Sequence, residues 1–266
     1  MKPGSLYESG RLGEARTAQD GTPAAESSRG EPMQSASGTA IARMKEPELL
    51  SPAVLEARRL IHAELADTEQ TDLFRELRTR LLMRWVTRNP VILVSGAGPG
   101  CGTSFVARNL AVSVSMEEDR TALLIDCHVR RPSHEAQFLP GEESPLGLLD
   151  FLSMPAIGLE RIIYPTGIPR LRMIPAGRSR RSSVEHFNSV RMRGLINELR
   201  GRYPDRSLIL DAPPARGAPD ARILAEHADM VVLVAGEGMH RAGTVTEAAE
   251  AFPPAKLAGV IFNHRP

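Results

Sequence analysis

Short apolar runs alternate with amphipathic segments from residue 90 onward, and this pattern predicts an α/β fold. Six aliphatic runs have the length of buried strands, at 91–95, 121–126, 171–175, 207–211, 230–234 and 257–262. Apolar residues at helical spacing predict helices at 104–116, 146–152, 184–200, 219–227 and 244–252. Strands that are apolar on both faces and alternate with helices are typical of a doubly wound, mostly parallel sheet.

Two further helices are predicted before the first strand, at 51–65 and 71–87. The apolar stripe of the second helix contains Leu73, Phe74, Leu77, Leu81 and Trp85, and its arginines lie largely off that stripe. Residues 1–40 are rich in Gly, Ser, Ala, Glu, Pro and Thr without apolar periodicity, which predicts a disordered tail. We therefore expect a disordered tail over 1–45, a helical extension for oligomerisation over 46–89 and an α/β domain over 90–266.

Composition and charge narrow the class of function. The 266 residues carry a formal net charge of +1, which gives no global attraction to nucleic acid or anionic lipid. No apolar run approaches the roughly 20 residues that span a bilayer, and the start of the chain lacks a signal-peptide core. We expect a cytoplasmic protein that reaches a membrane only through a partner.

A glycine-rich loop follows the first strand and precedes a helix, in the segment Gly96-Ala-Gly-Pro-Gly-Cys-Gly-Thr-Ser104. This order is typical of a phosphate-binding loop, whose backbone N–H groups surround phosphate at a helix N-terminus. The expected nucleotide-binding residues are Gly98, Gly100, Cys101, Gly102, Thr103 and Ser104. Thr103 stands where the motif has lysine, and no lysine occurs between Lys45 and Lys256.

Two later strands each end in an aspartate, at Asp126 and Asp211. Parallel strands present their carboxyl ends at the edge where ligands bind, so these carboxylates and the Ser104 hydroxyl are predicted to hold Mg²⁺. The alternative for either aspartate alone is a turn or helix-capping residue. Together with the loop, they favour a nucleotide site.

The cysteines and histidines suggest no further site. Cys101 and Cys127 are too few for a zinc cluster or disulfide scaffold, and we expect two reduced, partly buried thiols. Five histidines show no ligand spacing and are expected at the surface or in turns: His134, His186, His227, His240 and His264.

Two segments resemble motifs of bacterial tyrosine kinases. Residues 126–134 resemble the Walker A′ segment of these kinases and read Asp-Cys-His-Val-Arg-Arg-Pro-Ser-His. Residues 211–214 resemble their Walker B segment and read Asp-Ala-Pro-Pro. The resemblance spans about residues 70–263, and over 191–206 it is similar to the exosortase-linked autokinases of exopolysaccharide operons. Asp72-x-x-Arg75-x-x-Arg78 is close to the Glu-x-x-Arg-x-x-Arg helix with which such kinases form rings.

The resemblance implies an autokinase that uses ATP and Mg²⁺, with Asp126 and Arg130 in catalysis and with Asp72, Arg75 and Arg78 in oligomer contacts. It also implies a transmembrane polysaccharide co-polymerase (chain-length determinant) as partner, a homo-oligomer or a hetero-oligomer with an intact kinase, and no nucleic acid.

Three departures accompany the resemblance: Thr103 replaces lysine, His128 replaces the second Walker A′ aspartate, and the C-terminal tyrosine cluster is missing. Three hypotheses follow. The protein is a catalytically impaired regulator or scaffold of polysaccharide export, an active tyrosine autokinase with a rearranged phosphate site, or a positioning ATPase similar to ParA and MinD.

Overall fold

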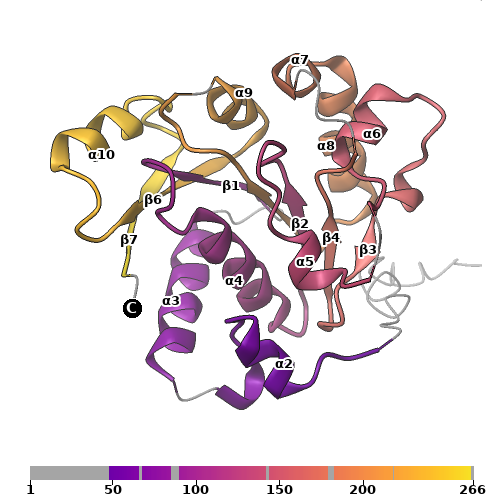
Figure 1. Ribbon diagram of the computed structural model, residues 1–266, viewed down its shortest axis with the longest axis horizontal. Helices are drawn as coiled ribbons and strands as arrows, with labels where there is room; N and C mark the ends of the chain where they lie inside the picture. Colours follow the sequence, from indigo (N-terminus) through magenta and orange to yellow (C-terminus); the bar gives the residue numbers. More distant parts are fainter. Residues whose placement is uncertain are drawn as a thin grey trace, which may run out of the picture. The chain divides into compact units, whose positions relative to one another are not determined.

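The computed structural model describes residues 48–65, 68–84, 90–141, 144–178, 183–217 and 219–264. Their centre is a seven-stranded sheet with the order β3-β4-β2-β5-β1-β6-β7 (Figure 1). Every neighbouring pair is parallel except β3 and β4. The doubly wound, mostly parallel sheet expected from the sequence is confirmed, whereas the predicted disordered tail lies outside the described residues.

The predicted strands differ from the observed ones by no more than two residues at either end. The strands are β1 (Val91–Gly96), β2 (Thr121–Asp126), β3 (Tyr164–Pro165), β4 (Leu171–Ile174), β5 (Arg206–Asp211), β6 (Met230–Gly236) and β7 (Leu257–Asn263). Strand β3 was not predicted, because it has only two residues and one of them is a proline.

The helices depart further from expectation. They are α2 (Pro52–Ala57), α3 (Glu69–Met83), α4 (Thr103–Ser115), α5 (Glu135–Phe138), α6 (Leu148–Ser153), α7 (Ser183–Phe187), α8 (Val190–Arg202), α9 (Asp220–His227) and α10 (Ala242–Ala249), with 3₁₀ turns at Ala63–Leu65 and Leu159–Arg161. The four-residue helix α5 was not predicted.

Two helix predictions are wrong in extent. The helix expected over 51–65 already ends at Ala57, because Arg59 has a left-handed φ of 55° and the chain turns there. The helix expected over 184–200 is divided into α7 and α8. Ser189 lies between them in an extended conformation, and its hydroxyl accepts a hydrogen bond from the Met192 amide at 3.1 Å, which caps α8.

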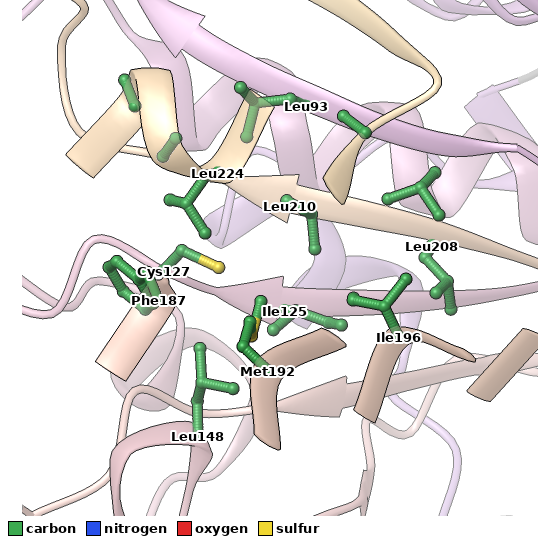
Figure 2. Packing of buried hydrophobic residues seen from close by; sticks show 14 of the residues in the cluster. Leu93, Ile125, Cys127, Leu148, Phe187, Met192, Ile196, Leu208, Leu210 and Leu224 are labelled. Atoms are coloured by element: carbon green, nitrogen blue, oxygen red, sulfur yellow. The ribbon is translucent and has the colours of Figure 1, made fainter. Parts of the chain in front are cut away.

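Helices cover both faces of the sheet, and alternate residues of each buried strand enter two separate cores. The core beneath α6 to α10 contains Leu93, Ile125 and Leu210, which pack with residues of these helices such as Leu224 (Figure 2). The other core contains the intervening strand residues with α2 to α5. This two-sided burial explains why the strands are apolar without alternation.

The predicted stripe of α3 is partly wrong. Phe74 and Leu81 are buried against α4 and the sheet, as expected, but Leu73 is 64 % exposed. Thr71 and Leu82 complete the buried face instead. Trp85, the fifth residue of the predicted stripe, lies outside the described residues.

Sheet order brings the three candidate segments together. Strand β1 lies between β5 and β6, and β2 lies on the other side of β5. In the sheet register, Asp126 is the partner of Asp211, and Asp211 is the partner of Val94 in β1. The glycine-rich loop and both strand-terminal aspartates therefore meet at one edge of the sheet.

Candidate functional site

The glycine-rich loop joins β1 to α4 and depends on its glycines at two positions. Gly100 and Gly102 have left-handed φ angles of 79° and 86°, which residues with a side chain rarely adopt. Gly102 also precedes the first turn of α4, so backbone N–H groups at this helix end are available to an anion. A Cβ atom on Gly102 would lie 2.1 Å from Nδ2 of Asn263. Asn263, at the end of β7, donates a hydrogen bond to the Cys101 carbonyl at 3.1 Å and thereby holds the loop.

Thr103, the residue in the lysine position, faces the inside of the loop. Its Oγ1 lies 3.3 Å from Sγ of Cys101, and both side chains are buried. A Cβ atom on Gly96 would lie 2.6 Å from each of these two atoms, so Thr103 and Cys101 occupy the space beside that glycine. Ser104 is the next residue and is half-buried.

Asp126 is fully buried at the end of β2, and the loop after it folds around its carboxylate. The backbone amides of His128 and Ser133 donate to Oδ1 and Oδ2 at 3.0 and 3.3 Å. Burial raises the pKa of Asp126, and the nearby charge of Asp211 acts in the same direction. His134 and the two amide hydrogen bonds oppose this rise.

His134 is fully buried, so the prediction of a surface or turn position is wrong for this histidine. Its Nε2 lies 2.8 Å from Oδ2 of Asp211, and its ring stacks on Phe138 with centroids 6.4 Å apart. Burial alone lowers the pKa of an imidazole. The hydrogen bond to Asp211 and the charges of Asp126 and Asp211 outweigh burial and the charge of Arg108, so the pKa of His134 is raised.

Sequence reasoning missed this contact because a histidine eight residues after Asp126 has no recognisable ligand spacing. The loop hydrogen bonds to Asp126 bring His134 back to the strand ends. The one signal in the sequence was that His134 belongs to the segment that resembles a Walker A′ segment and begins at a strand-terminal aspartate.

The remaining candidate residues differ in their exposure and surroundings. Arg130 has a 67 % exposed side chain, and its Nη2 lies 3.9 Å from Oδ2 of Asp220. His240 is half-buried in the turn after β6 and lies against the loop, because a Cβ atom on Gly98 would be 2.3 Å from its Nε2. Cys127 is fully buried, and burial raises the pKa of its thiol well above the usual value.

Lys256 does not serve the loop in the structure. It is the one lysine in the part of the chain that the structure describes, and its Nζ donates to the carbonyl oxygens of Ala225 and Glu226 at 2.8 and 3.3 Å. These carbonyls belong to α9, so the ammonium group is held at a helix end.

The arginine helix expected to form oligomer contacts is α3, and its residues have different surroundings. Asp72 and Arg75 pair with each other on the exposed side, with Oδ1 and Nη1 3.2 Å apart. Arg78 points to α4 instead: its Nη1 donates to the Ser113 carbonyl at 2.8 Å, and its Nε lies 2.9 Å from Oε1 of Glu117. An oligomer role for this helix remains a prediction.

Among the helices that the structure describes, none combines the length and the apolar character needed to cross a bilayer.

No family model matches the chain. Individual proteins do match the chain. It is 31 % identical over 194 residues to the tyrosine-protein kinase YwqD of Bacillus subtilis, and the alignment covers 71 % of this chain and 79 % of that protein. It is 29 % identical over 207 residues to the putative tyrosine-protein kinase EpsB of Ralstonia solanacearum, covering 77 % of this chain. The chain spans only 27 % of the length of EpsB.

Solved structures give the same grouping. The BceF tyrosine kinase domain is 28 % identical, with a TM-score of 0.67 over 83 % of this chain and 93 % of that domain. The VpsO kinase domain is 26 % identical, with a TM-score of 0.64 over 77 % of this chain and 100 % of that domain. A ParA family ATPase from Chlorobium tepidum, at 21 % identity and a TM-score of 0.52, shares the fold alone. The chain belongs to the bacterial tyrosine-protein kinase family.

Proposed function

We propose that this protein is a regulator or scaffold of exopolysaccharide biosynthesis and export whose phosphate site has lost efficient phosphoryl transfer. The observation that carries the proposal is the loop itself. Thr103 stands in the lysine position with its hydroxyl turned toward Cys101, and Lys256 is engaged by carbonyls of α9. A preorganised charge that stabilises a transferring phosphoryl group typically contributes about 3–4 kcal/mol, or 10²–10³-fold in rate.

The metal side of the site supports the same proposal. Asp126, Asp211 and Ser104 are the candidate Mg²⁺ ligands, but one oxygen of Asp211 is already engaged by His134. Arg130, the candidate catalytic cation, lies in an exposed position near Asp220. Binding of ATP with Mg²⁺ is therefore weak or lost in this proposal.

An active autokinase is the second candidate, and it is supported by the two strand-terminal aspartates, which are partners at one edge of the sheet. In that case Arg130 moves toward the phosphates when nucleotide binds, and Asp126 acts with it in catalysis. A positioning ATPase is the third candidate. The fold is shared with a MinD solved with Mg-ADP, but that protein is only 21 % identical to this chain.

The remaining parts of the proposal concern organisation. Residues 46–89 act as an oligomerisation arm with Asp72, Arg75 and Arg78, and residues 90–266 act as the kinase-like domain. The protein is cytoplasmic, and a transmembrane co-polymerase recruits it to the inner face of the plasma membrane. There it forms a homo-oligomer or joins an intact kinase.

Nucleotide binding and autophosphorylation test the proposal directly. Equilibrium dialysis of the full chain with ATP·Mg²⁺ is expected to show a dissociation constant above the micromolar range, and an anti-phosphotyrosine blot is expected to show no signal. The double variant Thr103→Lys/His128→Asp is expected to gain ATP affinity. Thr103→Gln/His128→Asn, which adds length without charge, is the matched control.

Two results would overturn the proposal. One is micromolar ATP binding with tyrosine phosphorylation by the unaltered chain. The other comes from complementation of a deletion strain, in which the size distribution of the exported polysaccharide is measured. The Ser104→Ala variant is expected to restore that distribution as well as the unaltered chain, and its failure would show that nucleotide chemistry is required.

A further inference from the structure

A cluster of three buried side chains lies at the carboxyl edge of the sheet: Asp126, His134 and Asp211. Each offers one ligand atom, and these atoms all lie within 4.8 Å of one another. We propose that this cluster binds one transition-metal ion of the zinc type, in preference to Mg²⁺. The inference concerns metal identity and does not depend on the role in polysaccharide export.

The donor set favours such an ion. Mg²⁺ takes oxygen ligands and keeps several waters, whereas an imidazole nitrogen suits Zn²⁺ and its neighbours in the first transition row. One imidazole and two carboxylates make a three-ligand set with a fourth position for water, as in many zinc proteins. Two ionised carboxylates balance the charge of a divalent ion, and the charge of Arg108 also acts on Asp211.

The hydrogen bonding of the cluster leaves two of its polar atoms unpaired. Oδ1 of Asp211 and Nδ1 of His134 are buried and have no hydrogen-bond partner among the described residues. A buried polar atom left unpaired typically costs about 1–3 kcal/mol. A cation bound to Oδ1 of Asp211 removes that cost for this oxygen. The hydrogen bond between His134 and Oδ2 of Asp211 does not remove it.

Outer contacts already orient the first ligand. The amides of His128 and Ser133 each donate to one oxygen of Asp126, which fixes the plane of this carboxylate, as the outer hydrogen bonds of metal sites do. Two atoms that each lie about 2.05 Å from a tetrahedral zinc ion are about 3.3 Å apart. The present distance from Nε2 of His134 to Oδ2 of Asp211 is 2.8 Å, so these two atoms must separate by about half an ångström to hold a metal ion. The ligand atom of Asp126 lies within 4.8 Å of both.

The test uses the full chain, stripped of metal with a chelator and dialysed. Calorimetric titration with Zn²⁺ is expected to show one equivalent bound at least about 100-fold more tightly than Mg²⁺. Co²⁺ is expected to give the visible bands of a four- or five-coordinate ion. The His134→Ala variant is expected to lose at least about tenfold in Zn²⁺ affinity and to lose the Co²⁺ bands. His240→Ala, which removes the histidine beside the glycine-rich loop, is the matched control and is expected to bind like the unaltered chain.

Three results would overturn the inference. They are the absence of stoichiometric Zn²⁺ binding, equal affinity in His134→Ala, and a near-ultraviolet cobalt–thiolate band that assigns the ion to Cys101 or Cys127. Far-ultraviolet circular dichroism checks that each variant is folded. If His134→Ala unfolds, His134→Asn decides the question by the same titration. No nucleotide is present in these measurements, so their outcome is separate from that of the ATP-binding test.

Discussion

Arg78 offers a direct test of whether the arginine helix stabilises the chain itself or serves only contacts between copies. Its side chain is 14 % exposed, and its Nη1 donates to the Ser113 carbonyl of α4. A hydrogen bond to a charged group contributes about 1.5–3 kcal/mol, and the partly exposed pair with Glu117 adds at most about 1 kcal/mol. We expect Arg78→Ala to lower the free energy of unfolding by about 2–3 kcal/mol. At about 2–4 °C per kcal/mol for a chain of this size, Tm falls by roughly 4–12 °C.

Arg75→Ala is the matched control for this prediction. Arg75 forms an exposed pair with Asp72 one turn earlier in the same helix, and such pairs contribute less than about 0.5 kcal/mol. Urea denaturation at two protein concentrations gives the free energies, and sedimentation velocity gives the oligomeric state. Two concentrations are needed because association makes the measured stability of an oligomer depend on protein concentration. A loss below about 0.5 kcal/mol for Arg78→Ala at both concentrations would refute the structural role.

Two further predictions concern glycine and histidine positions. Gly102→Ala is expected to lower the free energy of unfolding by at least about 1 kcal/mol in urea denaturation, because φ is left-handed and the new Cβ meets Asn263. Gly194 lies on the exposed side of α8 with open space around it, so Gly194→Ala is expected to raise the free energy of unfolding by about 0.5–1 kcal/mol. If the two variants change the free energy of unfolding in the same direction, this reasoning is contradicted. Burial lowers the pKa of His227 despite its hydrogen bond to the Phe187 carbonyl. As the pH falls through about 6.5, His227 is therefore protonated in the unfolded chain before it is protonated in the folded chain, and stability is lost. His227→Gln is therefore expected to flatten the fall of stability between about pH 7 and pH 5.5, and an unchanged slope would be evidence against the shift.

The sheet was predictable because its central strands are buried on both faces. A strand such as β2 is aliphatic from Ala122 to Ile125 and ends at a polar residue, so its position follows from the sequence alone. The position of Asp126 and Asp211 at one edge followed in turn from the rule that parallel strands end together. The register between them, which makes the two aspartates direct neighbours, comes from pairing across β5 and β2 and has no local signal.

The structural features that the sequence did not predict depend on contacts that form only when the chain folds back on itself. His134 is buried because the loop before it hydrogen-bonds to Asp126, an arrangement that no spacing rule describes. The division between α7 and α8 depends on one capping serine, Ser189, in a segment whose apolar spacing continues across it. Leu73 was placed on the buried face of α3 by periodicity, but the packing against α4 buries Thr71, Phe74, Leu81 and Leu82 and leaves Leu73 exposed.

The hydrogen bond from Asn263 to the Cys101 carbonyl joins residues that are 162 positions apart in the chain. During synthesis, β1 and α4 leave the ribosome long before β7. The glycine-rich loop therefore lacks one of its supports until almost the whole of the sheet has been made. A ligand that requires the finished loop cannot bind the incomplete chain. Ligand binding at this edge of the sheet therefore indicates that β7 has joined the sheet.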